Sequence, residues 1–158
     1  MKKSLVLFMI FVLSVSLIAC GKETKDKSLN DNVYKNEKLG FEFKIPERWG
    51  GNYQVKEIEK QETIPGETVE FLLSPKNAKD ENREGLLSFY IIDKNVYAES
   101  EKEEGPSIGE YLGEKGDLVY LVGLPQSNPF EVDSEEGKLF DTMHMSFEDV
   151  KEAFTITK

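Results

Sequence analysis

Cys20 is the only cysteine in the 158-residue chain, and it stands directly after the apolar residues Leu17, Ile18 and Ala19. A thiolate forms thioethers readily near neutral pH, so a cysteine at such a boundary is suited to covalent modification on sulfur. Because the sequence has no second cysteine, it allows neither an internal disulfide nor a metal site with several cysteine ligands. A folded domain must therefore be held together by its core.

The residues before Cys20 have the order of an export signal. Lys2 and Lys3 precede an apolar run at 5–13, and apolar character ends at Ala19, which is too short for the roughly 20 residues of a membrane-spanning helix. The stretch LIAC at 17–20 resembles the lipobox of bacterial lipoproteins. The resemblance implies cleavage between Ala19 and Cys20 and attachment of membrane lipid to Cys20. The mature protein would then be anchored to the cell membrane on its extracytoplasmic face, because two acyl chains give stable anchoring.

His144 is the only histidine, which excludes metal sites with several histidine ligands and leaves one residue for a histidine-based triad. Its neighbours Met143 and Met145 raise the idea of a Met-His-Met copper site. On a continuous helix, however, His144 and Met145 lie about 100 and 200 degrees around the axis from Met143, so the three side chains cannot converge unless the helix breaks. The alternative is a core methionine beside a flanking histidine. We expect neither a metal nor another cofactor.

Two acidic groups raise the question of calcium, namely Glu99, Glu101, Glu103 and Glu104, and Asp133, Glu135 and Glu136. Neither has the alternating Asp or Asn residues with a central glycine of an EF-hand loop, which favours a solvated acidic surface. Paired carboxylates could also serve a glycosidase, but among 30 acidic residues no pair stands out. Glycine-rich phosphate loops and the GxSxG motif do not occur in the sequence.

Aromatic residues offer a possible binding face made of Phe41, Trp49, Tyr53 and Tyr111. Trp49 is the only tryptophan, and the two glycines after it would allow an exposed platform for a sugar or peptide. It also follows the end of a predicted strand, which favours packing against the core instead.

The chain is strongly acidic. Loss of Lys2 and Lys3 with residues 1–19 leaves 18 basic and 30 acidic residues, and 13 and 26 of these lie from residue 39 onward. Nucleic-acid binding requires Lys and Arg to neutralise phosphates, so we expect no nucleic-acid partner. The same charge keeps the domain from lying flat on an anionic membrane.

The segment 21–38 has almost no apolar residues apart from Leu29, Val33 and Tyr34, which predicts a flexible tether. We therefore divide the chain into a signal peptide at 1–19, a lipidated cysteine and tether at 20–38, and a single acidic domain at 39–158. The length of the mature chain is typical of one domain.

From residue 39 onward, apolar and polar residues alternate with the period of half-buried strands. Strands are predicted at 41–45, 53–55, 69–73, 86–92, 108–113 and 117–123. The strand at 86–92 is apolar on both faces and is placed centrally, whereas the last two flank a short turn and predict a hairpin. Residues 93–104 predict a short surface helix in which Val96 and Tyr97 are nearly the only apolar residues.

The C-terminal part changes to a helical period. Phe140, Met143, Phe147, Val150 and Phe154 are spaced as one stripe of an amphipathic helix. Ser134 is the predicted N-cap. Ser146 followed by Asp149 resembles a second capping signal, so the helix is either continuous or broken near Met145. Residues 155–157 could form an edge strand.

These elements predict an α+β domain, with an antiparallel sheet of five to seven strands and a C-terminal amphipathic helix packed on one face. The opening GFEFKIPERW at 40–49, followed by strands and a late helix, resembles the start of PsbP/Mog1-like domains, although a convincing central helix is missing. The chain is also similar to small lipoproteins of Gram-positive bacteria. The first resemblance implies a partner-binding domain without catalysis.

The predicted function is a membrane-anchored extracytoplasmic lipoprotein whose domain binds a protein or cell-envelope ligand. The alternatives are a small carboxylate-dependent cell-wall hydrolase and an immunity or inhibitor lipoprotein. An enzyme would hold carboxylates with displaced pKa values in a concave site. A binding module would expose an aromatic or apolar patch.

Overall fold

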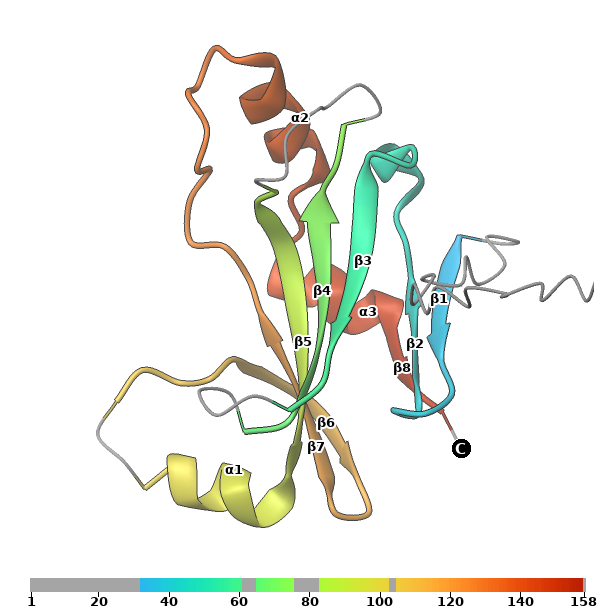
Figure 1. Ribbon diagram of the computed structural model, residues 1–158, viewed down its shortest axis with the longest axis vertical. Coiled ribbons are helices and arrows are strands. Elements are labelled where there is room, and N and C mark those ends of the chain that lie inside the picture. The colour runs from blue at the N-terminus through green and yellow to red at the C-terminus, as the bar shows by residue number, and fades with distance from the viewer. Residues whose placement is uncertain (1–31, 61–64, 76–82, 103–104, 158) are drawn as a thin grey trace, which may run out of the picture.

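The computed structural model describes residues 32–60, 65–75, 83–102 and 105–157 (Figure 1). Within these residues the chain forms two antiparallel sheets with short helices around them. The predicted α+β class is confirmed. The strands are shared between a three-stranded and a five-stranded sheet, where a single sheet was predicted.

The three-stranded sheet has the order β1-β2-β8. Its strands are β1 (Val33–Asn36), β2 (Phe41–Lys44) and β8 (Phe154–Ile156). Phe41 and Phe43 alternate along β2 with Glu42 and Lys44, so the two aromatic side chains point to one face, where they are fully buried. The turn from β1 to β2 ends at Gly40, whose φ of 71° is a left-handed conformation that favours glycine.

The five-stranded sheet has the order β3-β4-β5-β7-β6, so β3 and β6 are its edges. Its strands are β3 (Tyr53–Ile58), β4 (Glu67–Leu73), β5 (Gly85–Asp93), β6 (Glu110–Lys115) and β7 (Leu118–Gly123). The central position predicted for 86–92 is confirmed by β5, and the predicted hairpin is confirmed by the pairing of β6 with β7. Both faces of β5 are buried, because Leu87 and Phe89 point toward the main core and Ile92 points away from it.

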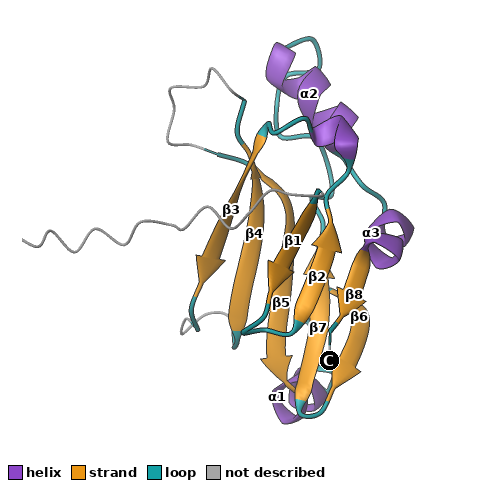
Figure 2. Cartoon of the chain, turned by 90° about the vertical axis from the view of Figure 1, so that its right-hand side faces the viewer, coloured by secondary structure: helices purple, strands orange, loops and turns teal. Residues whose placement is uncertain are grey.

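An aromatic core joins the two sheets. Phe43 of β2 contacts Phe71 of β4 and Phe89 of β5, with ring centroids 5.2 and 5.1 Å apart and steep angles between the planes. Edge-to-face packing of this kind stabilises aromatic clusters beyond the area they bury. On one side the sheets meet where β8 lies beside β6 (Figure 2), and there the Lys115 ammonium donates a hydrogen bond to the Thr157 carbonyl at 2.6 Å.

The C-terminal stripe is divided between two helices, α2 (Glu135–Met143) and α3 (Phe147–Ala153). The predicted caps explain the break. The Ser134 hydroxyl caps α2, and Ser146 and Asp149 form a reciprocal capping box that starts α3. Helix α2 packs near the 3-10 helix η1 (Glu47–Trp49), and α3 leads directly into β8.

The short helix predicted within 93–104 is confirmed as α1 (Lys94–Ser100). It follows β5 without a loop, because the Asp93 side chain caps it by accepting a hydrogen bond from the Asn95 N–H at 2.8 Å. Figure 1 shows α1 and α2 at opposite ends of the molecule.

The prediction that a tether extends to residue 38 is wrong at its C-terminal end. Val33–Asn36 form β1, which pairs with β2 along its whole length. A four-residue edge strand buries only one face, which here carries Tyr34 and Asn36, and the Tyr34 ring packs against Phe41 and Phe71. The folded domain therefore includes β1, and residues 20–31 of the predicted tether lie outside the described residues.

Candidate functional site

Phe41 and Trp49 belong to the core and are not part of a binding face. Both side chains are fully buried. After β2 ends, η1 turns the chain so that the Trp49 ring packs against Phe43, with centroids 6.1 Å apart. The Trp49 indole N–H donates a hydrogen bond to the Met143 carbonyl at 2.7 Å, which ties η1 to the end of α2. The alternative interpretation of Trp49 as a core residue is confirmed.

Tyr53 and Tyr111 lie on opposite edge strands of the five-stranded sheet. Tyr53 is partly buried against Trp49, with ring centroids 5.5 Å apart, and this burial raises the pKa of its hydroxyl. Tyr111 is 44% exposed. The predicted face made of Phe41, Trp49, Tyr53 and Tyr111 is therefore wrong, because strand alternation and η1 turn the first two inward and the sheet separates the others.

Exposed aromatic surface is found instead on the outer face, by which we mean the face of the five-stranded sheet that points away from β1, β2 and β8. A second, smaller core of Ile92, Val119 and Leu121 lies there. Tyr97 of α1 packs against this core and contacts Tyr111 of β6. The two rings have centroids 6.1 Å apart and planes inclined by 33°, and we call them the tyrosine pair.

Regular elements hold both members of the tyrosine pair. The pairing of β6 with β7 sets Tyr111 beside Leu121 of the smaller core. Tyr97 is in the middle of α1, and the cap at Asp93 fixes the start of that helix at the end of β5. Side chains carried on packed elements are more rigid than side chains on loops. The pair is therefore a preformed surface.

Charged side chains lie beside the tyrosine pair. The Glu114 carboxylate accepts a hydrogen bond from the Lys94 ammonium at 2.8 Å, and this contact raises the pKa of Lys94, with a further contribution from Asp117. Burial raises the pKa of Tyr97, and the nearby Glu101 carboxylate raises it further. Glu101 thus lies near Tyr97, and Lys94, whose ammonium is already paired with Glu114, lies near Tyr111.

Only part of this site could be predicted from the sequence. Tyr97 stood out as one of two apolar residues in a polar helix, and Tyr111 was proposed as part of a different face. Their contact depends on the path of the chain from β5 through α1 to β6, which no local pattern specifies.

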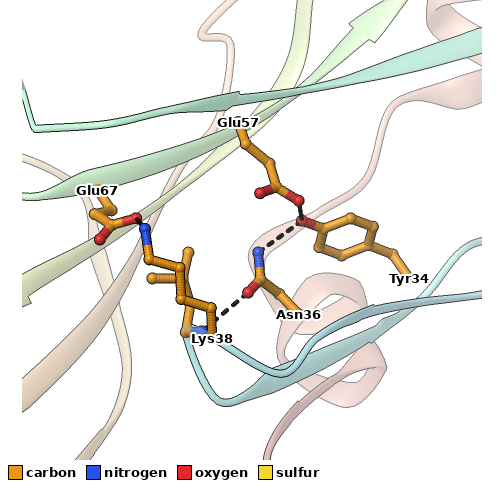
Figure 3. A network of polar contacts seen from close by, with 6 residues as sticks. Tyr34, Asn36, Lys38, Glu57 and Glu67 are labelled. Atoms are coloured by element: carbon orange, nitrogen blue, oxygen red, sulfur yellow. Dashed lines mark hydrogen bonds and ion pairs between the residues drawn. The ribbon is translucent and has the colours of Figure 1, made fainter. Parts of the chain in front are cut away.

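A polar network joins the two sheets on the side where β1 approaches β3 (Figure 3). The Tyr34 hydroxyl donates to Glu57 at 2.7 Å and accepts from the Asn36 amide at 2.9 Å. Asn36 is buried, and its side-chain amide oxygen accepts a hydrogen bond from the Leu39 backbone N–H at 2.9 Å. Burial, followed by the Glu57 contact, raises the pKa of Tyr34 above its ordinary range. In the same view the Lys38 ammonium contacts Glu67 at 2.9 Å.

This network has a structural role. Among the described residues every buried side-chain nitrogen and oxygen has a hydrogen-bond partner. A fully satisfied buried network rigidifies the chain and favours one arrangement of it. It therefore holds β1, the first strand of the domain, against the five-stranded sheet.

The break after α2 does not assemble a copper site. The side chains of Met143 and Met145 are buried, whereas His144 between them is exposed. Among the described residues no group of three or more His, Cys, Asp or Glu side chains is placed to hold a metal ion. Two members of the first acidic group, Glu103 and Glu104, lie outside the described residues.

Asp149 is a carboxylate whose displaced pKa has a structural cause. The Ser146 backbone N–H donates to it at 3.1 Å and lowers its pKa, and the Ser146 hydroxyl adds to this effect. Displaced carboxylate pKa values often mark active sites, but here the capping box of α3 accounts for the shift.

Ala19 and Cys20 lie outside the described residues. In the part of the chain that the structure describes, none of the helices has the length and apolar character needed to cross a membrane. Comparison of the chain with protein-family models, curated proteins and solved structures finds no significant match. The resemblances to the lipobox and to PsbP/Mog1-like domains stay predictions.

Proposed function

We propose that this protein is a bacterial lipoprotein anchored to the extracytoplasmic face of the cell membrane, and that its domain binds a protein or another cell-envelope ligand without catalysis. The N-terminal sequence supports the anchor, because a basic start and a short apolar run lead to LIAC and to the sole cysteine.

The geometry of the domain supports the binding function. Residues 21–31 separate Cys20 from the first described residue, and a chain of this length reaches at most roughly 40 Å. The anchor therefore keeps the domain near the membrane surface. The chain enters the domain at β1, an edge strand of the three-stranded sheet. The outer face of the five-stranded sheet points away from β1. The tyrosine pair on this face is therefore accessible to a ligand, and this observation carries the proposal.

The anchor is tested by replacing Cys20 with alanine and labelling growing cells with an alkyne fatty acid. We expect the wild-type protein to take up label and fractionate with membranes, and C20A to be unlabelled and either unprocessed or released. Ser28→Ala, a polar position just beyond the cysteine, is the matched control and should behave like wild type. Membrane retention of C20A with lipid label still attached would refute the anchor.

Binding is tested with a photoreactive amino acid at one position of the anchored protein in intact cells. We expect the group at Tyr111 to give a discrete covalent product. The same group at Glu152, which is exposed on α3, is the control and should not give this product. Equal products from both positions, or none from Tyr111, would contradict binding through the outer face.

The two alternatives differ in what supports them. For the hydrolase, a pair of catalytic carboxylates would be needed. Glu57 and Asp149 have specific contacts of a structural kind, since Glu57 accepts from Tyr34 and Asp149 caps α3. An immunity or inhibitor lipoprotein would use the same exposed surface and differ only in its partner. Identification of the Tyr111 product by mass spectrometry would therefore separate this alternative from other binding functions.

A further inference from the structure

We propose that the tyrosine pair binds a cationic side chain, arginine or lysine, presented by a protein partner. The inference rests on the proposed binding function and adds the chemistry of the ligand. Three properties of the described residues carry it, namely the exposure of the rings, their fixed position and the sign of the surrounding charge.

The exposure of the tyrosine pair gives the first reason. Among the described residues, Tyr111 and Val132 are the large hydrophobic side chains with substantial exposure, at 44% and 81%. Val132 stands in the connection between β7 and α2, whereas Tyr111 contacts a second ring. An aromatic face attracts a cation placed within about 6 Å of the ring centroid. The second ring, Tyr97, lies beside it with centroids 6.1 Å apart and planes inclined by 33°.

The fixed position of the rings gives the second reason. Tyr97 is held by α1 and the smaller core, and Tyr111 lies on a paired strand. A surface that is ordered before binding loses little conformational entropy when a ligand arrives.

The surrounding charge gives the third reason. The Lys94 charge is engaged by Glu114 and lies near Asp117, whereas the Glu101 carboxylate lies close to Tyr97 of the pair. The domain as a whole has twice as many acidic as basic residues from residue 39 onward. Such a field attracts cationic partners and repels anionic lipid and a second copy of this acidic chain. A basic protein segment is therefore the occupant that fits the surface.

The test uses the full-length protein in a neutral detergent and a fluorescent peptide of alternating arginine and glycine, with binding followed by anisotropy. We expect the wild type to bind this peptide and not the peptide with glutamine in place of arginine. Tyr111→Leu keeps an apolar side chain but removes the ring, and we expect binding to weaken about two- to fivefold. Tyr111→Phe keeps the ring and should bind like wild type.

Charge variants separate a local site from the overall acidity. Glu101→Gln, beside the pair, should weaken binding more than Glu152→Gln, which makes the same change in net charge on α3. Each variant is compared by circular dichroism and melting temperature, so that a loss of binding is read only from folded protein.

Three results would overturn the proposal. They are equal binding of the arginine and glutamine peptides, equal weakening by the two glutamate variants, and unchanged affinity in Tyr111→Leu. If any of these occurs while the photoreactive group at Tyr111 still captures a discrete partner, the binding function stands and the cationic ligand is wrong. If the Tyr111 product is also missing, both proposals fail.

Discussion

Replacement of Trp49 by phenylalanine tests the packing of η1 against α2. The indole N–H donates to the Met143 carbonyl at 2.7 Å, and the ring is fully buried. An unpaired buried carbonyl costs about 1–2 kcal/mol, and the void left by the smaller ring costs about 1 kcal/mol more. We therefore expect the free energy of unfolding to fall by about 2–3 kcal/mol and the melting temperature by about 10 °C.

The assay for Trp49→Phe is urea unfolding followed by far-ultraviolet circular dichroism, because the variant has no tryptophan fluorescence. Tyr53→Phe, which changes a partly buried neighbour of Trp49, is the control and should stay within about 0.5 kcal/mol of wild type. In the wild type, emission from the single tryptophan should be blue-shifted and resist quenching by iodide. Ready quenching, or a stability loss below about 0.5 kcal/mol, would refute the buried placement.

Three further predictions follow from the core, the polar network and the capping box. Val150 is fully buried on α3 whereas Phe147 is only partly buried, so Val150→Asp should cost several kcal/mol and more than Phe147→Asp in urea unfolding. Asn36→Ala removes two hydrogen bonds from a buried site and should lower the free energy of unfolding by about 2 kcal/mol; a change below about 0.5 kcal/mol would show that the network is dispensable. The lowered pKa of Asp149 contributes stability above the pKa of the unfolded carboxyl, near 4, and this contribution is lost as pH falls through the lower folded pKa. Asp149→Asn should therefore flatten the acid limb of stability against pH, and an unchanged limb would contradict this cause.

The sequence alone determined the local structure where one periodicity or cap dominates. Alternation in Phe41 and Phe43 predicted β2, the two-sided apolar run predicted the central strand β5, and Ser146 with Asp149 marked the start of α3. These signals are local, because side chains a few residues apart share a face or close a cap. The α+β class followed from counting such segments. The sequence likewise carries the whole case for Cys20 as an anchor.

Only the tertiary structure decided which aromatic residues are exposed. The sequence grouped Trp49 and Tyr111 in one possible binding face, although it favoured core packing for Trp49. In the structure η1 turns Trp49 into the core, while an edge strand leaves Tyr111 exposed. The sequence pattern also placed the residues of β1 in the tether. An edge strand with one buried face needs few apolar residues, and β1 is held in part by long-range contacts such as that of Tyr34 with Glu57. The meeting of Tyr97 and Tyr111 depends on strand order and on the return of α1 over the sheet. These are long-range features, since each residue's burial depends on partners far away in the sequence.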